Sequence, residues 1–521
     1  MTAVTDGILA EYWRLHPVEA THAGVHDFDA SPADLSAAGF GARRDWRARC
    51  RTRLQAEPVT DADDALDRRV LLRELTRQDI VDEDWQWPRR APMLYLEQAL
   101  NGLQYALARP AADGSAEALA ARVAAIPRLL ADGQRNLRGE LVPAEYVEIS
   151  LVATAGAQRF LADLEVVATA AGQVVAELDR PVAAALTAVA EFDRFLRQDL
   201  HPTGAFALGQ DLFERMLREV HGVPLSADDV YQHGQDLAAS LSSALGPTWR
   251  ADVEALKADH PSPDTLLQTY ADEALRARQF VEAHQLVSIP AGERFEVRPT
   301  APFLRATMPL GHFDRTPPFS ATDNLGVLYI TPVDAQLPAA RQAELLSAHC
   351  FTAIRAICLH ETFPGHHVQL WHAKLRASAV RRQFASTLFT EGWALYCEEM
   401  LEEAGYYDSP GLGLWRVKNA MWRAVRLMVD VGLHCRGLNL EDAARPLAEL
   451  GGLEPNTARG EALRYTTSPT QPSSYVLGRD RIMELRRAAQ RQPGFSLATF
   501  HDELLGYSSV PPADIPLAVS C

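Results

Sequence analysis

The sequence His360-Glu361-Thr362-Phe363-Pro364-Gly365-His366-His367 places three histidines and one carboxylate within eight residues. It directly follows an apolar run of helical character at residues 351–359. Imidazole and carboxylate are common zinc ligands, and hydrolytic zinc sites use about three protein ligands with one position left open. The stretch therefore predicts a zinc site at the end of a helix.

The spacing of these histidines differs from that of the common helical zinc motif, HExxH, in which two histidines four residues apart share one face. Here Pro364 occupies the fourth position. His360 and His367 would be about 10.5 Å apart along a straight helix, too far for one ion. Pro364 clashes with the carbonyl of His360 in a regular helix, and Gly365 tolerates unusual dihedrals. We therefore expect a bulge that brings His366 beside His360, with His367 as the alternative ligand or as a group that contacts a ligand or the substrate.

Two carboxylates complete this hypothesis. Glu361 is the candidate general base, which takes a proton from water held on zinc. Glu391 lies in the apolar run Leu388-Phe389-Thr390-Glu391-Gly392-Trp393. Burial of an unpaired carboxylate is costly, so we interpret Glu391 as the third metal ligand rather than as a surface glutamate.

Three later residues are candidates for supporting roles. Asp430 and His434 lie four residues apart on one predicted helical face. Asp430 is suited to orient a ligand imidazole, and His434 to polarise a substrate carbonyl. Tyr475 is suited to donate to the oxyanion of a tetrahedral intermediate. An ordinary helix-surface pair and a core tyrosine are the structural alternatives.

Composition narrows the class of protein. The 521 residues carry a formal net charge of -17 and no basic stripe, which argues against a nucleic-acid partner. The six cysteines show no paired spacing, which is typical of reduced thiols. The N-terminal residues do not resemble a signal peptide, and no run of eighteen apolar residues lacks charge. These features predict a cytoplasmic protein that is not bound to a membrane.

The periodicity along the chain predicts a mostly α-helical fold. We expect one helical unit over residues 1–521. A division of this unit into two lobes around a cleft, at about 1–285 and 286–521, is the alternative. Between about 290 and 335, β-formers at 295–298, 303–308 and 325–330 predict short strands. An edge strand before the metal helix could pair with an extended substrate, or the strands could form a structural hairpin.

Several stretches resemble the bacterial "domain of unknown function 885" family, viewed as zinc-peptidase-like. They are HETFPGHH at 360–367, EGWALY at 391–396, DVGLH at 430–434, QPSSYVLG at 471–478, and the segments 17–27 and 500–505. The resemblance implies a mostly helical fold similar to the neurolysin-type and carboxypeptidase-Taq-type metallopeptidases, with zinc in a deep cleft. It also favours functional roles for Asp430, His434 and Tyr475.

The sequence thus predicts a zinc-dependent hydrolase that cleaves a peptide or related amide bond in a small substrate. Zn²⁺ is held by His360, His366 and Glu391, and Glu361 activates water. One alternative is a metal-dependent enzyme that acts non-hydrolytically on a small specialised metabolite. Another is a metal-free binding protein with the same fold.

Overall fold

The computed structural model describes residues 2–108, 115–170, 178–300, 305, 308 and 310–516. The chain forms two compact units. Unit 1 comprises Met1–Phe206, Pro302–Thr307 and Pro317–Thr322, and unit 2 comprises Ala207–Ala301, Met308–Thr316 and Asp323–Cys521. Helices dominate both units and one small sheet accompanies them, which confirms the predicted fold class.

Unit 1 is built from helices alone in the part that the structure describes. They are α1 (Thr2–Leu15), α2 (Pro17–Ala23), η1 (His26–Phe28), α3 (Ala37–Ala56), α4 (Ala62–Asp79), η2 (Ile80–Asp84), α5 (Trp87–Arg90), α6 (Pro92–Ala108), α7 (Ser115–Asn136), α8 (Ala144–Ala162), α9 (Leu164–Ala170), α10 (Asp179–Arg194) and η3 (Phe195–Asp199).

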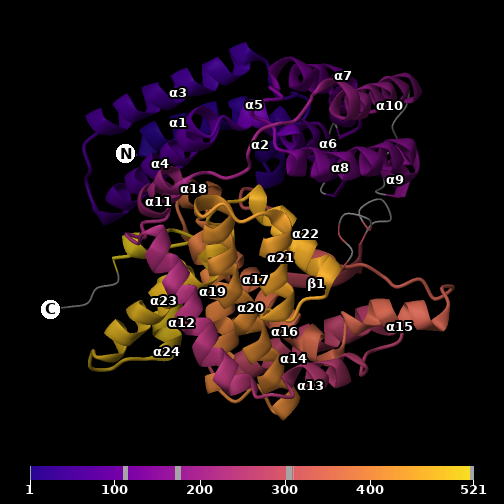
Figure 1. Cartoon of the computed structure of the whole chain (residues 1–521). Helices are drawn as coiled ribbons and strands as arrows, with labels where there is room; N and C mark the ends of the chain where they lie inside the picture. Colours follow the sequence, from indigo (N-terminus) through magenta and orange to yellow (C-terminus); the bar gives the residue numbers. More distant parts are fainter. Residues whose placement is uncertain are drawn as a thin grey trace. The chain divides into compact units, whose positions relative to one another are not determined.

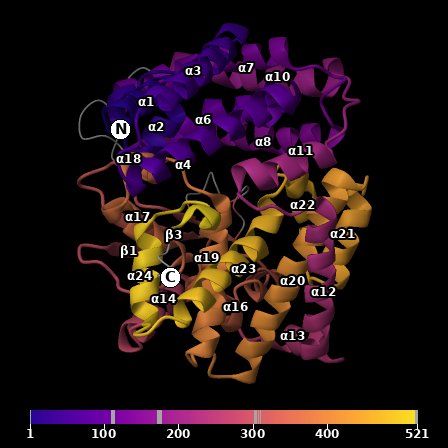
Figure 2. The same ribbon diagram turned by 90° about the vertical axis from the view of Figure 1, so that its left-hand side faces the viewer.

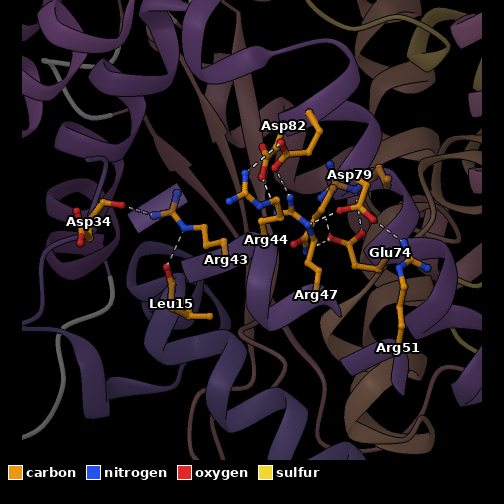
Figure 3. A network of polar contacts seen from close by, with 12 residues as sticks. Leu15, Asp34, Arg43, Arg44, Arg47, Arg51, Glu74, Asp79 and Asp82 are labelled. Atoms are coloured by element: carbon orange, nitrogen blue, oxygen red, sulfur yellow. Dashed lines mark hydrogen bonds and ion pairs between the residues drawn. The ribbon is translucent and has the colours of Figure 1, made fainter. Parts of the chain in front are cut away.

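A buried arginine holds the first long helices of unit 1 together (Figure 3). Arg47 on α3 is 1% exposed, and it donates to Asp79 at 2.5 Å and to Asp82 at 2.8 Å. Beside it, Arg43 donates to the carbonyl of Asp34 at 2.8 Å. A buried cation requires such partners, because leaving it unpaired is costly. The network therefore fixes α3 against the end of α4.

Unit 2 contains the candidate site and all the remaining helices of the described residues (Figure 1). They are α11 (Gln210–Arg215), η4 (Met216–Val220), α12 (Ala227–Leu245), α13 (Trp249–Lys257), α14 (Leu266–Ala283), α15 (Ala339–Ser347), α16 (Phe351–Glu361), α17 (His366–Arg376), α18 (Ala379–Gln383), α19 (Thr387–Glu403), α20 (Pro410–Cys435), α21 (Leu440–Glu449), α22 (Pro455–Thr466), α23 (Gln471–Gln490), α24 (Leu497–Gly506) and η6 (Pro512–Asp514).

The sheet of unit 2 has three strands in the order β1 (Arg294–Pro299), β3 (Leu325–Ile330), β2 (Gly311–Asp314). β1 runs parallel to β3, and β2 runs antiparallel to it. The strands expected at 295–298 and 325–330 are confirmed, whereas β2 was not expected. The strand expected at 303–308 falls largely outside the described residues. Leu328 and Ile330 of β3 pack with Tyr270 of α14 and Ile354 of α16, so the sheet supports the helix that precedes the histidine cluster.

Two glycines allow the central helices of unit 2 to pack closely. A Cβ on Gly478 of α23 would lie 1.8 Å from the carbonyl oxygen of Leu388, and one on Gly392 of α19 would lie 2.5 Å from the backbone of Gly478. Any larger residue would separate the two helices. Figure 2 shows α19 and α23 beside α20 and α16 from a second direction.

No described helix has both the length and the apolar character needed to cross a membrane. All five cysteines in the described part of the chain are free, and none of them is exposed.

Candidate metal centre

The histidine cluster lies where one helix ends and the next begins. α16 ends at Glu361, α17 starts at His366, and Gly365 precedes it as the N-cap residue. A Cβ at position 365 would lie 1.8 Å from the carbonyl oxygen of His360, so only glycine lets the chain return this closely. The Pro-Gly pair therefore interrupts the helix completely, in place of the expected bulge within one helix.

The return of the chain is fixed from α19. The indole Nε1 of Trp393 donates to the carbonyl of Pro364 at 2.9 Å, and this indole is fully buried. Gly365 donates its N–H to the carbonyl of Leu359 at 3.1 Å. These two bonds hold the loop against the end of α16, so the first residue of α17 faces the last turn of α16.

The interruption brings the predicted ligands together. The rings of His360 and His366 meet edge to face, with centroids 4.9 Å apart. Ligand atoms of His360, Glu361 and His366 all lie within 4.8 Å of one another. Residues that a straight helix would have pointed to different sides thus share one small volume.

Glu391 of α19 completes the cluster. Its Oε2 lies 3.7 Å from Nε2 of His360 and 3.6 Å from Nε2 of His366. Ligand atoms that share a tetrahedral zinc at bonds of about 2.0–2.1 Å are separated by about 3.4 Å. Oε2 is buried and has no hydrogen-bond partner among the described residues. The spacing is long for hydrogen bonds but close to that of atoms that share a cation, so His360, His366 and Glu391 fit a zinc ion.

The electrostatics of the cluster favour positive charge. Burial opposes protonation of His360, yet its close contacts with the carboxylates of Glu391 and Glu398 raise its pKa to about 9. Burial likewise opposes ionisation of Glu391, but contact with the two imidazoles holds its pKa well below the ordinary value. The same carboxylates would stabilise a bound divalent cation.

Glu398 is a site residue that sequence reasoning missed. Nδ1 of His360 lies 3.0 Å from Oε1 of Glu398, and the Glu398 side chain is buried. Such an outer carboxylate fixes the orientation of an imidazole and leaves Nε2 free to bind metal. The available signal was its spacing, because Glu391 and Glu398 lie seven residues apart and so occupy the same face of α19.

His367 faces the sheet and not the cluster. Its Nε2 lies 2.7 Å from Oε1 of Glu293, and both side chains are 1% exposed. Arg278 contacts the other oxygen of Glu293 at 2.9 Å. A Cβ on Gly326 of β3 would lie 2.3 Å from Nδ1 of His367. His367 therefore anchors α17 to the β1–β3 side of the unit.

Tyr475 lies beside the cluster. Its ring stacks on that of His360, with a centroid distance of 6.2 Å and an interplanar angle of 18°. Burial, and next the charge of Glu391, raise the pKa of Tyr475, which keeps the phenol protonated and able to donate. The structure thus brings Tyr475 together with His360 and Glu391.

Asp430 reaches this region only indirectly. It accepts from the N–H of Thr470 at 3.2 Å and from the hydroxyl of Ser473 at 2.6 Å. Burial raises its pKa to about 7, although these donors favour the ionised form. Asp430 therefore holds the beginning of α23, the helix that carries Tyr475, and its bonds are not with a ligand imidazole.

The contacts of His434 point away from catalysis. Nδ1 accepts from the N–H of Leu208 at 3.3 Å, and Nε2 lies 3.0 Å from the carbonyl oxygen of Tyr465. Its ring stacks on Phe213, and burial lowers its pKa to about 4. Both ring nitrogens are thus engaged in holding neighbouring segments together.

A cavity of about 220 Å³ lies behind Glu398, between α12, α19, α20 and α23. Its charged lining residues are three glutamates and three arginines: Glu398, Glu399, Glu402, Arg416, Arg423 and Arg479. Arg416 pairs with Glu402, and Arg479 with Glu399, each at 2.7 Å. The carboxylate behind His360 therefore borders a polar space and not a dry core.

Comparison with known proteins identifies relatives by sequence and by structure. The model of a family described as "Bacterial protein of unknown function (DUF885)" matches residues 17–519. No curated protein matches the chain.

Two solved structures share the fold. One is described as "a putative lipoprotein of unknown function from Shewanella oneidensis", with a TM-score of 0.78, 19% identity and 98% of each chain covered. The other is described as "the putative lipoprotein from Colwellia psychrerythraea", with a TM-score of 0.80 and 18% identity. It covers 99% of this chain and 97% of its own. At this identity the likeness establishes the fold alone.

Proposed function

Because the chain belongs to the bacterial DUF885 family, whose function is unknown, we propose an activity from the geometry of its candidate metal centre: zinc-dependent hydrolysis of a peptide or related amide bond in a small substrate. The observation that carries this proposal is the position of Glu391 Oε2, 3.7 and 3.6 Å from the Nε2 atoms of His360 and His366. Two imidazoles and one carboxylate form a ligand set used by catalytic zinc.

Zinc, when bound, supplies Lewis acidity, which makes water more acidic and polarises a carbonyl group. His360, His366 and Glu391 are the residues that would hold it. Glu398 keeps the His360 imidazole in one orientation through its contact with Nδ1.

Glu361 is the proposed general base. It lies in the same cluster as the two histidines, and it is only partly buried, so a water molecule can reach it. In the proposed reaction its carboxylate takes a proton from the attacking water and delivers that proton to the leaving amine. Glu391, the other carboxylate of the cluster, contacts both imidazoles and is therefore less available as a base.

Tyr475 is the proposed donor to the oxyanion. Its phenol keeps its proton, and its ring is held against His360. A neutral donor at a fixed position stabilises negative charge that develops on the substrate oxygen. His434 is left out of this proposal, because Leu208 and Tyr465 engage its ring nitrogens.

The proposed compartment is the cytoplasm. The five cysteines in the described part of the chain are free and unexposed, which supports it, since reduced thiols are typical of a reducing environment. The two structural relatives are described as lipoproteins, and that description refers to those proteins.

Metal analysis together with a peptide-turnover assay tests the function. The purified protein should contain about one zinc per chain, and it should cleave members of a short-peptide library in a reaction that a chelator stops. Glu361→Gln should retain the zinc and lose turnover, whereas Glu344→Gln, at an exposed glutamate, should behave as wild type. A protein that binds no zinc would contradict the metal centre. Zinc binding without turnover of any amide would favour non-hydrolytic chemistry.

A further inference from the structure

A group of cations surrounds one tryptophan on α20, next to Tyr475. We call Lys418, Trp422, Arg423 and Arg426 the Trp422 cluster. The guanidinium carbons of Arg423 and Arg426 lie 4.5 Å and 4.3 Å from the centroid of the Trp422 ring, and Nζ of Lys418 lies 6.0 Å from it. All three cationic residues are less than a tenth exposed. Stacking on the indole holds the guanidinium planes in place.

The cluster presents hydrogen-bond donors without acceptors. Among the described residues, buried N–H groups without a partner include Nε and Nη1 of Arg423, Nη1 of Arg426 and Nε1 of Trp422. Guanidinium and indole nitrogens can only donate. An unsatisfied buried donor costs about 1–3 kcal/mol, and more when it is charged. Four such donors lie on three side chains that stack together, which favours the binding of an anion nearby.

The neighbouring carboxylates do not neutralise the cluster. Glu461 contacts Arg426 at 3.1 Å, but it also pairs with Arg464 at 3.0 Å. Glu398 lies 3.9 Å from Arg423 and already bonds His360. Lys418 has no carboxylate partner within ion-pair distance in the described part of the chain. The cations therefore outnumber the carboxylates that are available to them.

The pKa of Lys418 is consistent with this surplus of cations but has a larger cause. Burial, and next the charge of Arg423, lower the pKa of Lys418 to about 8. Burial alone disfavours a charged ammonium group, and the nearby guanidinium adds to that effect.

One aromatic ring links this cluster to the metal centre. The guanidinium carbons of Arg426 and Arg423 lie 4.4 Å and 5.8 Å from the centroid of the Tyr475 ring. The same ring stacks on His360 at 6.2 Å. A peptide spans at most about 3.3–3.6 Å per residue. A substrate group bound at the cluster is thus only a few residues from an amide bond at the metal centre.

We propose that the Trp422 cluster binds the free carboxylate of the substrate, so that the substrates are short peptides or acylated amino acids cleaved close to their C-terminal end. This inference rests on the proposed hydrolase function and names its substrate class. Paired guanidinium groups match the planar carboxylate. Trp422, the ring on which the guanidinium groups stack, is only partly buried.

A binding experiment tests the proposal without depending on turnover. The probes are two pools of N-acetyl-dipeptides, identical except that one has free C-terminal acids and the other C-terminal amides. Equilibrium dialysis against the zinc-loaded, full-length Glu361→Gln protein gives the acid-to-amide affinity ratio. We expect the acids to bind at least tenfold more tightly. Amides that end in aspartate or glutamate should bind as weakly as the other amides, which separates an α-carboxylate from a side-chain carboxylate.

Variants of the cluster residues test whether these residues cause the difference in affinity between acids and amides. In the same protein, Arg423→Gln should bring the ratio near one, and Arg423→Lys should leave it intermediate. Arg436→Gln is the matched control, because Arg436 stacks on Tyr231 at 3.7 Å but is paired with Asp228. Its ratio should stay at the starting value. Lys418→Met, which keeps an apolar stem, should lower the ratio about threefold and provides the test if Arg423→Gln does not fold.

Two outcomes would overturn the proposal: equal affinity for acids and amides, or a preference that survives both Arg423→Gln and Lys418→Met. Failure of the hydrolase function is a different result. If the protein prefers acids but cleaves neither pool, the carboxylate site is supported and the hydrolase function is contradicted. If the wild-type protein cleaves acids and amides equally well, the hydrolase function is supported and the carboxylate site is contradicted.

Discussion

His360 and Glu398 form a buried pair in which Nδ1 of the imidazole lies 3.0 Å from Oε1 of the carboxylate. Less than a tenth of either residue is exposed. The pair turns Nε2 of His360 toward Glu391 and His366, so the orientation of a proposed metal ligand depends on a residue two helical turns from Glu391.

The first prediction concerns this pair. Glu398→Gln should weaken zinc affinity about 10–100-fold, because an amide does not hold the imidazole in one tautomer as a carboxylate does. Competition with a chromogenic chelator measures the affinity. Glu399→Gln is the control, since Glu399 pairs with Arg479. Unchanged affinity in Glu398→Gln would show that the contact does not support the metal.

The second prediction concerns the helix break. Gly365→Ala should destabilise the protein by about 3 kcal/mol, because its Cβ would lie 1.8 Å from the carbonyl oxygen of His360. The same change should reduce zinc binding by moving His366. Gly413→Ala, in an open part of α20, should instead stabilise by about 0.5–1 kcal/mol. Urea unfolding measures both, and a Gly365→Ala protein of wild-type stability would contradict the account of the break.

The third prediction concerns Tyr475. Tyr475→Phe should lower kcat about 100-fold with zinc content unchanged, as expected when one oxyanion donor is removed. Tyr407→Phe is the matched control, because the Tyr407 hydroxyl is buried without a partner among the described residues. Steady-state kinetics on a cleaved library peptide provide the measurement. A Tyr475→Phe enzyme with full kcat would exclude the hydroxyl from the reaction.

The fourth prediction concerns acid stability. His501 is buried; its Nδ1 lies 2.6 Å from the carbonyl oxygen of Leu286, and its Nε2 lies 2.7 Å from the hydroxyl of Tyr396. Burial lowers its pKa to about 4, although the bond to Leu286 opposes the shift, and the charged neighbours Arg486 and Asp502 act in opposite directions. The unfolded chain has an imidazole pKa near 6.5 and therefore binds more protons than the folded chain between pH 6.5 and 4. The stabilising contribution is thus complete above pH 6.5 and is lost progressively as the pH falls from 6.5 through 4.

This contribution can be isolated with His501→Gln, which cannot titrate. Between pH 7 and pH 4.5 the wild type should lose about 2–3 kcal/mol more of its free energy of unfolding than the variant does. Urea unfolding at the two pH values gives the difference. Equal losses would mean that His501 does not contribute to the acid sensitivity.

Local patterns in the sequence were enough to predict much of the molecule. Apolar residues at helical spacing predicted the mostly helical fold, and β-formers predicted two of the three strands. Local patterns also selected His360, Glu361, His366 and Glu391 as candidate site residues. A carboxylate within an apolar run and a histidine pair around Pro364-Gly365 both call for a chemical explanation, such as metal binding. These inferences depend on neighbours within about one or two turns, which the sequence displays directly.

The tertiary structure decided what those residues contact. Whether His366 or His367 faces His360 depends on how the chain leaves Pro364, and that path is held by Trp393 from α19 and by Glu293 beside the sheet. Glu398, Arg423 and Arg426 gain their significance only when α19, α20 and α23 pack together, and the packing assigned His434 and Asp430 to structural contacts. Side chains brought together by packing are far apart in the sequence, so no local period records their distances. The sequence by itself thus supplies the residue types that a metal centre needs, and the close packing of the helices sets their geometry.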